Sequence, residues 1–361
     1  MLKRVQQQRT WRPSDHGFTM VELIVVMGII TLLLSLAIPA AGRVREAARK
    51  TQCLNNLRNI AFALTQHEHY NGKFPASGSF GLKADSSTAG LFTWAVAILP
   101  YLDQANLYNQ LDLSRSKNDP KNAALASAYI PIYICPVDIT RNDEKQGDLS
   151  YAVSGGVGFT VYRNQVHDCP VDRNWTVLDL NGDGQGCTGN DPIDDLDKAA
   201  FDSMGLFFLE TRNSEITQRN HSLKDVKDGT SQTFLVSENV RAGFDPDSSG
   251  VNFASVDPYR CAFYIGNPCN NNNGHCSAGN VDYSLANSGE NRINSGLWSA
   301  EGTSPIPNSF HAGGVNMAYA DAHVAFLSET IDGAVYAALA SPQGGALGGP
   351  LKQVLVSGGN F

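Results

Sequence analysis

The apolar stretch Leu23–Ala41 limits what this chain can fold into more than any other part of its sequence. It holds 19 consecutive residues without a charged side chain, which is just enough for a helix to cross a hydrocarbon core of about 30 Å. A basic leader precedes it, with the charged residues Lys3, Arg4, Arg9, Arg12 and Asp15. Positive charge on this side favours the cytoplasm for the N-terminal end. The sequence therefore predicts a membrane anchor whose following chain is exported.

The residues that join the leader to the apolar stretch decide whether the anchor is retained. A secretory signal peptide has its small-residue cleavage site after the apolar run, whereas here Gly17 lies before it. Cleavage at Gly17 leaves the apolar segment on the mature protein, beginning at Phe18. Glu22 lies at the edge of this segment. Because an unpaired carboxylate is costly in a membrane, we expect Glu22 to have a partner after assembly.

The leader, Gly17, Phe18, Glu22 and the unbroken apolar helix resemble the prepilin signal of type IV pilins and type II secretion pseudopilins. The resemblance implies cleavage after Gly17 by a prepilin peptidase and methylation of the Phe18 amine. It also implies that Glu22 neutralises the N-terminal amine of a neighbouring pilin-like subunit. The alternative is an ordinary signal anchor that contains Gly-Phe by chance.

The helix is predicted to continue beyond the apolar stretch. Residues 43–70 contain no Pro or Gly, and their apolar residues recur at three- and four-residue spacing. Pro39 is expected to kink the helix, and Asn71-Gly72 is a typical stop. We therefore divide the chain into a basic leader (1–17), a transmembrane segment (18–41), the periplasmic half of a spine helix (42–72) and an extracytoplasmic head (73–361).

A second resemblance covers most of the chain, from Gly17 to about Leu327. The segment from Cys53 to Ile60, the segment from Tyr70 to Pro75, and later stretches such as Ile134–Asp138 are similar to a large bacterial family of prepilin-like proteins of unknown function. That family carries a His, nine residues and then Asp-Gly near its C-terminus. Here His311 and Asp321 have this spacing, but Ala322 follows the Asp.

The head reads as an α+β domain. Strands are predicted over Tyr129–Cys135, Met204–Glu210 and Thr233–Val240, and Val315–Leu327 is predicted to form a strand pair. Residues 155–200 and 243–290 are rich in Gly, Asp, Asn and Ser and read as polar surface insertions. The predicted fold is pilin-like, with a long N-terminal transmembrane spine helix packed on a large antiparallel-sheet head with loop insertions.

His311 and Asp321 have two interpretations. In the first they are structural, with His311 tied to the following turn through Asp321. In the second His311 belongs to a binding site. The turn itself is predicted to be a longer loop based on a type I turn, because Ala322 disfavours the positive φ angles of a type I′ turn.

The segment Asp179–Gln185 is the sharpest chemical signal in the sequence. Oxygen-bearing residues alternate and are followed by Gly, as in the first half of an EF-hand-type calcium loop. The candidate calcium ligands are Asp179, Asn181, Asp183, Gln185 and Asp191. The twelfth position is Asn190 rather than the Glu of a complete loop, so the match is partial. A metal-free, solvated turn rich in Asp and Asn remains the alternative.

Seven cysteines occur, and an exported location permits disulfides. Cys169 and Cys187 flank the acidic loop and are candidates to close it. Two of Cys261, Cys269 and Cys276 are candidates to link the second insertion. Because the count is odd, at least one thiol stays free unless it pairs between chains.

Charge and motifs exclude several functional classes. Removing residues 1–17 leaves 23 basic and 34 acidic residues, a net charge of −11, so nucleic acid is not an expected partner. No Gly-x-Ser-x-Gly, Walker loop or His-Glu-x-x-His motif occurs in the sequence. We therefore do not expect an enzyme.

The expected function is structural: a pseudopilin or pilin-like component of a type II secretion or type IV pilus-like assembly. The expected location is the bacterial inner membrane, crossed once, with the head in the periplasm or at the cell surface. The alternative is a surface module that uses the prepilin route only for delivery and binds glycan or protein with calcium. The size of the head keeps this alternative open.

Overall fold

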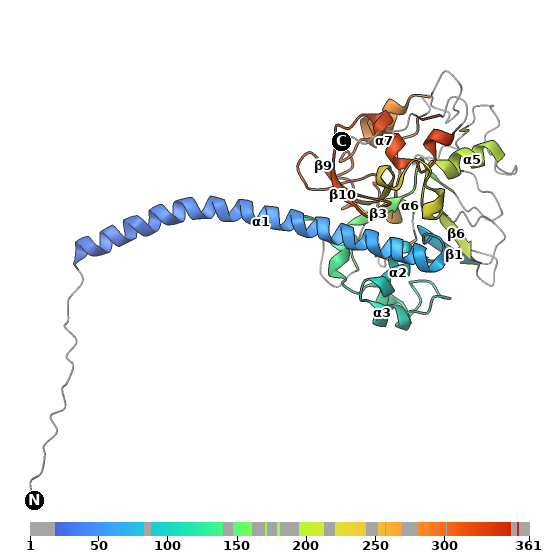
Figure 1. The fold of residues 1–361 in the computed structure, drawn as a ribbon. Helices are drawn as coiled ribbons and strands as arrows, with labels where there is room; N and C mark the ends of the chain where they lie inside the picture. The colour runs from blue at the N-terminus through green and yellow to red at the C-terminus, as the bar shows by residue number, and fades with distance from the viewer. Residues whose placement is uncertain are drawn as a thin grey trace, which may run out of the picture. The chain divides into compact units, whose positions relative to one another are not determined.

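Figure 1 shows the computed structural model of the chain. The chain consists of two compact units, Met1–Ala48 and Arg49–Phe361. The structure describes residues 19–82, 88–139, 147–160, 170–171, 179–180, 195–212, 221–242, 252–256, 258–268, 281–300, 302–347 and 352–353.

The first helix, α1, extends from Met20 to Asn71 and passes Pro39 without ending (blue in Figure 1). Gly72 follows it with a φ angle of 73°, and its amide donates to the Glu68 carbonyl, which closes the last turn. The helix predicted from Phe18 to Tyr70 is therefore confirmed, with its ends displaced by one or two residues. Within the part of the chain that the structure describes, no helix meets the length and apolarity required of a membrane span.

The C-terminal part of α1 belongs to the second unit and packs into its core. Cys53, Leu57, Ile60, Ala61 and Leu64 are fully buried. Their three- and four-residue spacing places them on one side of the helix, as the sequence pattern predicts. Arg58 and Asn59, which lie between them in the sequence, stay exposed. The head is thus built on an amphipathic helix.

The main sheet has five strands in the order β10-β9-β7-β3-β8. Neighbouring strands are antiparallel except β3 and β8, which are parallel. The strands are β3 Tyr151–Ser154, β7 Phe234–Glu238, β8 Ala262–Phe263, β9 Gly314–Tyr319 and β10 Val324–Ser328. Both faces of β3 are buried. Tyr151 and Val153 join the core that contains Leu57 of α1, while Ala152 joins a second core that contains Tyr336.

Two smaller sheets accompany the main one. A three-stranded sheet has the order β2-β1-β6, and β4 pairs with β5. Their strands are β1 Gly78–Leu82, β2 Thr88–Thr93, β4 Phe159–Thr160, β5 Pro170–Val171 and β6 Leu209–Arg212. The α+β class and the predominance of antiparallel pairing agree with the prediction.

The remaining helices are short. The α-helices are α2 Trp94–Ala97, α3 Ala105–Gln110, α4 Ala123–Ala126, α5 Asp195–Ser203, α6 Pro258–Cys261 and α7 Gly333–Ala340. The 3₁₀ helices are η1 Leu99–Tyr101, η2 Pro131–Tyr133, η3 Leu223–Asp225, η4 Thr230–Gln232, η5 Tyr283–Asn287, η6 Gly289–Asn291 and η7 Gly344–Ala346. Much of both polar insertions, 155–200 and 243–290, lies outside the described residues.

Two strand predictions are wrong. Residues 131–133 form η2 rather than the centre of a strand over Tyr129–Cys135. Pro131 occupies the first turn of η2, where its missing N–H and fixed φ suit a helix better than a ladder. Of the strand predicted over Met204–Glu210, only the last residues belong to β6. Both segments are rich in apolar and aromatic residues, which predicts that they are buried but does not decide their backbone conformation.

The hairpin between β9 and β10 confirms the predicted strand pair. The Ala322 amide donates to the Tyr319 carbonyl, and the Tyr319 amide donates to the His323 carbonyl. Ala322 has a φ angle of 65°, in the left-handed region. This is the pattern of a three-residue loop that joins a type I turn to a left-handed residue. The loop is therefore type I-based, as expected, but Ala322 adopts the positive φ angle that we considered unfavourable for it.

Candidate functional site

The first predicted site begins at the N-terminal end of α1. Gly17 and Phe18 lie outside the described residues. Glu22 is described, and its carboxylate accepts hydrogen bonds from the Thr19 amide at 2.9 Å and from the Thr19 hydroxyl at 2.8 Å. The Glu22 amide in turn donates to the Thr19 hydroxyl at 3.2 Å. This reciprocal pattern is a capping box.

Beyond the capping box, α1 presents apolar side chains to solvent. Ile24 is 68% exposed, Met27 59%, Leu32 63% and Ile38 69%. Because exposed apolar residues follow one another along successive positions, they occur on all sides of the helix. A helix that is apolar all round is normally covered by lipid or by other helices.

A second site, which the sequence did not predict, lies in the core of the head. Cys53 of α1 and Cys135, just after η2, form a disulfide across 82 residues of sequence. Beside it, the His311 Nε2 atom lies 3.2 Å from Glu238 Oε1. Cys135 Sγ lies 3.7 Å from the same carboxylate oxygen and 3.9 Å from His311 Nε2. We call Cys53, Cys135, Glu238 and His311 the Cys-Glu-His cluster.

Strand pairing explains how the cluster is assembled. Tyr151 pairs with Glu238 across β3 and β7, and paired residues share a face. Tyr151 faces the core that contains α1, so Glu238 faces α1 and the disulfide. Ser237 pairs with Met317, which places Asn316 next to Glu238 on the neighbouring strand. His311 lies just before β9 on the same side.

The cluster is dry and its carboxylate is held firmly. Glu238 has no exposed surface and His311 is 5% exposed. The Asn316 backbone amide donates to Glu238 Oε2, and Asn316 Nδ2 donates to Oε1, each at 2.9 Å. Burial and the nearby Glu238 carboxylate raise the pKa of Tyr151 well above its ordinary value. A buried carboxylate is tolerated when it is hydrogen-bonded and faces a basic group, and Glu238 meets both conditions.

His311 and Asp321 have different partners in the structure. His311 contacts Glu238, whereas Asp321 accepts from His323, whose Nδ1 atom lies 2.6 Å from Asp321 Oδ1. The His323 ring stacks on Tyr319, with centroids 4.1 Å apart. We expected a contact between His311 and Asp321. Instead, His311 contacts Glu238 in the core, and Asp321 contacts His323 within the hairpin.

The predicted calcium residues are described only in part. Asp179 is fully buried, and the Leu180 amide donates to the carboxylate of Asp197, which is 1% exposed. Asn181, Asp183, Gln185 and Asp191 lie outside the described residues. Calcium binding stays a prediction.

The predicted insertion disulfides also fall largely outside the described part of the chain. This holds for Cys169, Cys187, Cys269 and Cys276. Cys261 is described and is buried at the end of α6. The disulfide that the structure describes joins the two cysteines that lie outside both insertions. In the sequence, Cys53 lies within the predicted helix and Cys135 at the end of a predicted strand, and neither was a candidate for a disulfide.

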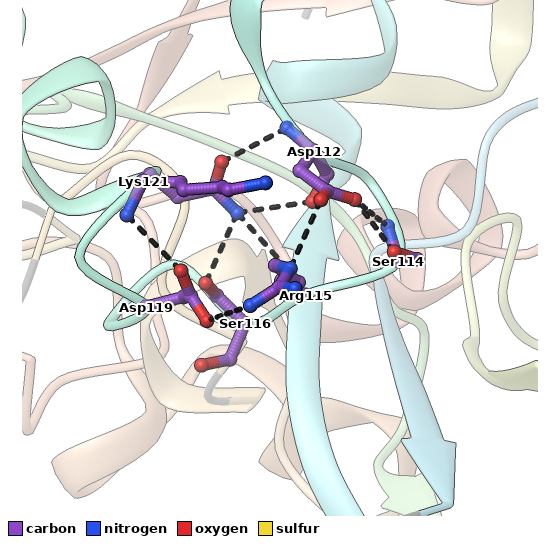
Figure 2. Close-up of polar contacts among 7 residues, drawn as sticks. Asp112, Ser114, Arg115, Ser116, Asp119 and Lys121 are labelled. Carbon is purple, nitrogen blue, oxygen red and sulfur yellow. Dashed lines mark hydrogen bonds and ion pairs between the residues drawn. The ribbon is translucent and has the colours of Figure 1, made fainter.

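A further polar cluster surrounds the loop 112–122 (Figure 2). Arg115 makes ion pairs of 3.0 Å with Asp112 and 2.9 Å with Asp119. Asn122, which is fully buried, accepts from the Asp112 amide and donates to the carbonyls of Asp112, Arg115 and Ser116. Because Arg115 pairs with both carboxylates and Asn122 binds the backbone of the same loop, these contacts hold the loop in its own conformation.

The fold and the N-terminal segment together define a prepilin-type protein, because a model of the prokaryotic N-terminal methylation motif matches residues 12–38. The larger part of the chain places it in a family: the model described as "Protein of unknown function (DUF1559)" matches residues 42–334, and the chain belongs to this family. Both resemblances drawn from the sequence are confirmed.

The chain is also similar to a curated pilin. The toxin coregulated pilin of Vibrio cholerae is 25% identical over 129 residues. The aligned region is 35% of this chain and 55% of the pilin, so the chain spans about half the length of this relative. No solved structure matches the chain.

Proposed function

We propose that this protein is a membrane-anchored, pilin-like structural subunit of a type II secretion or type IV pilus-like assembly. The observation that carries the proposal is the N-terminal methylation motif at residues 12–38, which includes the exposed apolar stretch at the start of α1. The similarity to a pilin supports the same reading.

The chemistry of assembly follows from the exposed side chains. In a single subunit, residues 23–41 need lipid around them, and in an assembly the helices of other subunits replace that lipid. Each helix that enters the bundle carries the positive amine of Phe18 and the negative carboxylate of Glu22 into a medium of low dielectric constant. Pairing the amine of one subunit with the carboxylate of the next removes both unpaired charges.

The proposed partners are the bacterial inner membrane, a prepilin peptidase that cleaves after Gly17, and other pilin-like subunits. The head lies on the extracytoplasmic side, and the chain crosses the membrane once. The proposed role needs no catalytic residue and no nucleic acid.

The first test is intact mass and N-terminal sequencing of the protein from native membranes. A chain that begins at N-methylated Phe18 supports processing by the prepilin route. A chain that still begins at Met1 contradicts it and leaves a plain membrane anchor.

A second function that we propose is calcium-dependent binding of glycan or protein by the head. Two buried carboxylates favour it, because Asp179 and Asp197 are both at most 1% exposed beside the partial calcium loop. A carboxylate withdrawn from water gains from a cation nearby. Calcium titration of the purified protein, followed by glycan binding with and without a chelator, tests this function. This function is contradicted if the titration detects no calcium binding up to millimolar concentrations.

A further inference from the structure

The four residues of the Cys-Glu-His cluster are of three types, Cys, Glu and His, and each type binds zinc in proteins. One ligand atom from each residue can be chosen so that all four lie within 4.8 Å of one another, and all four residues are buried. We propose that this cluster has two states. In the oxidised state Cys53 and Cys135 form the disulfide, and in the reduced state their thiolates bind one Zn²⁺ ion together with His311 Nε2 and Glu238 Oε1.

The distances already fit a tetrahedral ion. Zinc bonds to S, N and O of about 2.0–2.3 Å place ligand atoms roughly 3.3–3.8 Å apart. In the cluster, the distance from His311 Nε2 to Glu238 Oε1 is 3.2 Å. Cys135 Sγ lies 3.7 Å from that oxygen and 3.9 Å from that nitrogen. Three edges of the tetrahedron are therefore present before any metal enters.

The fourth ligand needs only the reduction of one bond. Cys53 and Cys135 have Cα atoms 5.0 Å apart, on α1 and on the segment that follows η2. Once the sulfur–sulfur bond is broken, the two side chains separate by rotation about their Cα–Cβ bonds. The backbone elements that carry them stay in place.

The surroundings orient the ligands as the outer shell of a metal site does. Asn316 holds both carboxylate oxygens of Glu238 through hydrogen bonds from its backbone amide and its side chain. The Ser309 hydroxyl accepts from the His311 amide at 3.2 Å and fixes the backbone that carries the imidazole. Partners of this kind hold the metal-binding side chains in position, and their loss typically lowers metal affinity about 10- to 100-fold.

The charge balance is also suitable. Two thiolates, one carboxylate, a neutral imidazole and Zn²⁺ have a net charge of minus one. A Cys₃His zinc site, which is a common structural type, has the same net charge. The ligand set belongs to a closed structural site, because the described residues that surround it leave Glu238 and the two cysteines without exposed surface.

The two states are related by a balanced redox step. A dithiol reductant gives two electrons and two protons to the Cys53–Cys135 disulfide, which becomes two thiols while the reductant becomes a disulfide. Zn²⁺ then displaces the two thiol protons, which pass to solvent. A reducing compartment favours the metal state and an oxidising one favours the disulfide. The inference does not depend on the assembly role.

The test uses the full-length protein in detergent, in oxidised form and after reduction with a non-chelating phosphine. Zinc content is measured after desalting, and Co²⁺ is added in parallel as a spectroscopic probe. We expect one equivalent of metal in the reduced protein, with the intense visible bands of tetrahedral Co²⁺ bound to thiolate. The oxidised protein takes up none.

Variants identify the ligands. His311→Ala and Glu238→Gln are expected to weaken Co²⁺ binding by the reduced protein at least tenfold, and His323→Ala is the matched control because His323 lies outside the cluster. The proposal is overturned if the reduced wild-type protein binds no metal, or if His311→Ala binds as tightly as the control. The proposal is also overturned if reduction unfolds the wild-type protein and added zinc does not restore the fold.

Discussion

Thr19 and Glu22 cap each other at the start of α1, so the carboxylate expected to pair subunits is already engaged within its own chain. Both the amide and the hydroxyl of Thr19 donate to Glu22. Both hydrogen bonds end on Oε2, so the amine of a neighbouring subunit, in the assembly that we propose, can bind Oε1 or share Oε2. The capping role and the pairing role of Glu22 are separable by mutation.

Glu22→Gln is expected to keep the capping box and abolish assembly. Gln at this position still reaches the backbone amide of the N-cap residue, but it has no charge to offer a neighbouring amine. Glu22→Ala loses both roles. We expect both variants to reach the membrane and neither to form cross-linked multimers. Normal multimers from Glu22→Gln, measured by cysteine or chemical cross-linking in intact cells, contradict the pairing role.

Breaking the Cys53–Cys135 disulfide is expected to destabilise the head by roughly 2–5 kcal/mol. The bond joins residues 82 positions apart in the sequence. The longer the loop that a disulfide closes, the more conformational entropy it removes from the unfolded chain. Denaturant unfolding of Cys53→Ser, Cys135→Ser and the double variant in detergent measures the loss. Because either single change removes the same bond, all three should unfold at similar midpoints. A double variant much less stable than the singles contradicts this account.

The His311 and Glu238 pair is expected to be strongly coupled. His311→Ala leaves the fully buried Glu238 carboxylate without the imidazole 3.2 Å away, and losing a hydrogen bond to a charged group costs about 1.5–3 kcal/mol. Adding Glu238→Gln removes the unpaired charge, so the double variant should recover part of the loss. A double-mutant cycle on the oxidised protein measures the coupling. Additive losses show that the two groups do not interact.

Local patterns predicted the elements that are regular along the sequence. The helix over 20–71 follows from an unbroken apolar stretch and the three- and four-residue period after it. The β9–β10 hairpin follows from alternation with a turn at Ala320–His323. The strand predicted at Tyr129–Cys135 failed because composition reports burial, whereas Pro131 decides the backbone. Similar residues are buried in helices, strands and 3₁₀ turns alike.

The Cys-Glu-His cluster was beyond the reach of sequence patterns. Its members come from α1, the segment after η2, β7 and the loop before β9, so only the order of strands in the sheet brings them together. His311 was singled out by its spacing to Asp321, yet its partner is Glu238, far away in the sequence. The sequence around Glu238 does not identify it as a member of this cluster. Its one local feature is that it is the acidic last residue of β7.

Asn122 is expected to matter more than the charges around it. Its buried side chain makes four hydrogen bonds to the backbone of the 112–116 segment, and Asn122→Ala leaves those groups unsatisfied. We expect a loss of about 2–4 kcal/mol. Arg115→Ala removes two exposed ion pairs and should change the unfolding midpoint far less. Equal effects of the two substitutions would refute the ranking.

His67 is expected to make the head less stable in mild acid. It lines a cavity of about 270 Å³ with Lys73 and Glu210, and burial, followed by the charge of Lys73, lowers its pKa despite a hydrogen bond to the Lys73 carbonyl. Because the folded pKa is depressed, the unfolded chain binds a proton first as the pH falls. Stability should therefore decrease from about pH 6.5 down to the lowered pKa and level off below it.

The matched substitutions for this pH dependence are His67→Gln and His69→Gln. His69 is exposed, on the same helix two residues away. Unfolding free energies measured between about pH 5 and pH 7 should show a flatter pH dependence for His67→Gln than for the wild-type protein. His69→Gln should keep the wild-type dependence. Equal slopes in the two variants would mean that another group, rather than His67, binds the proton on unfolding.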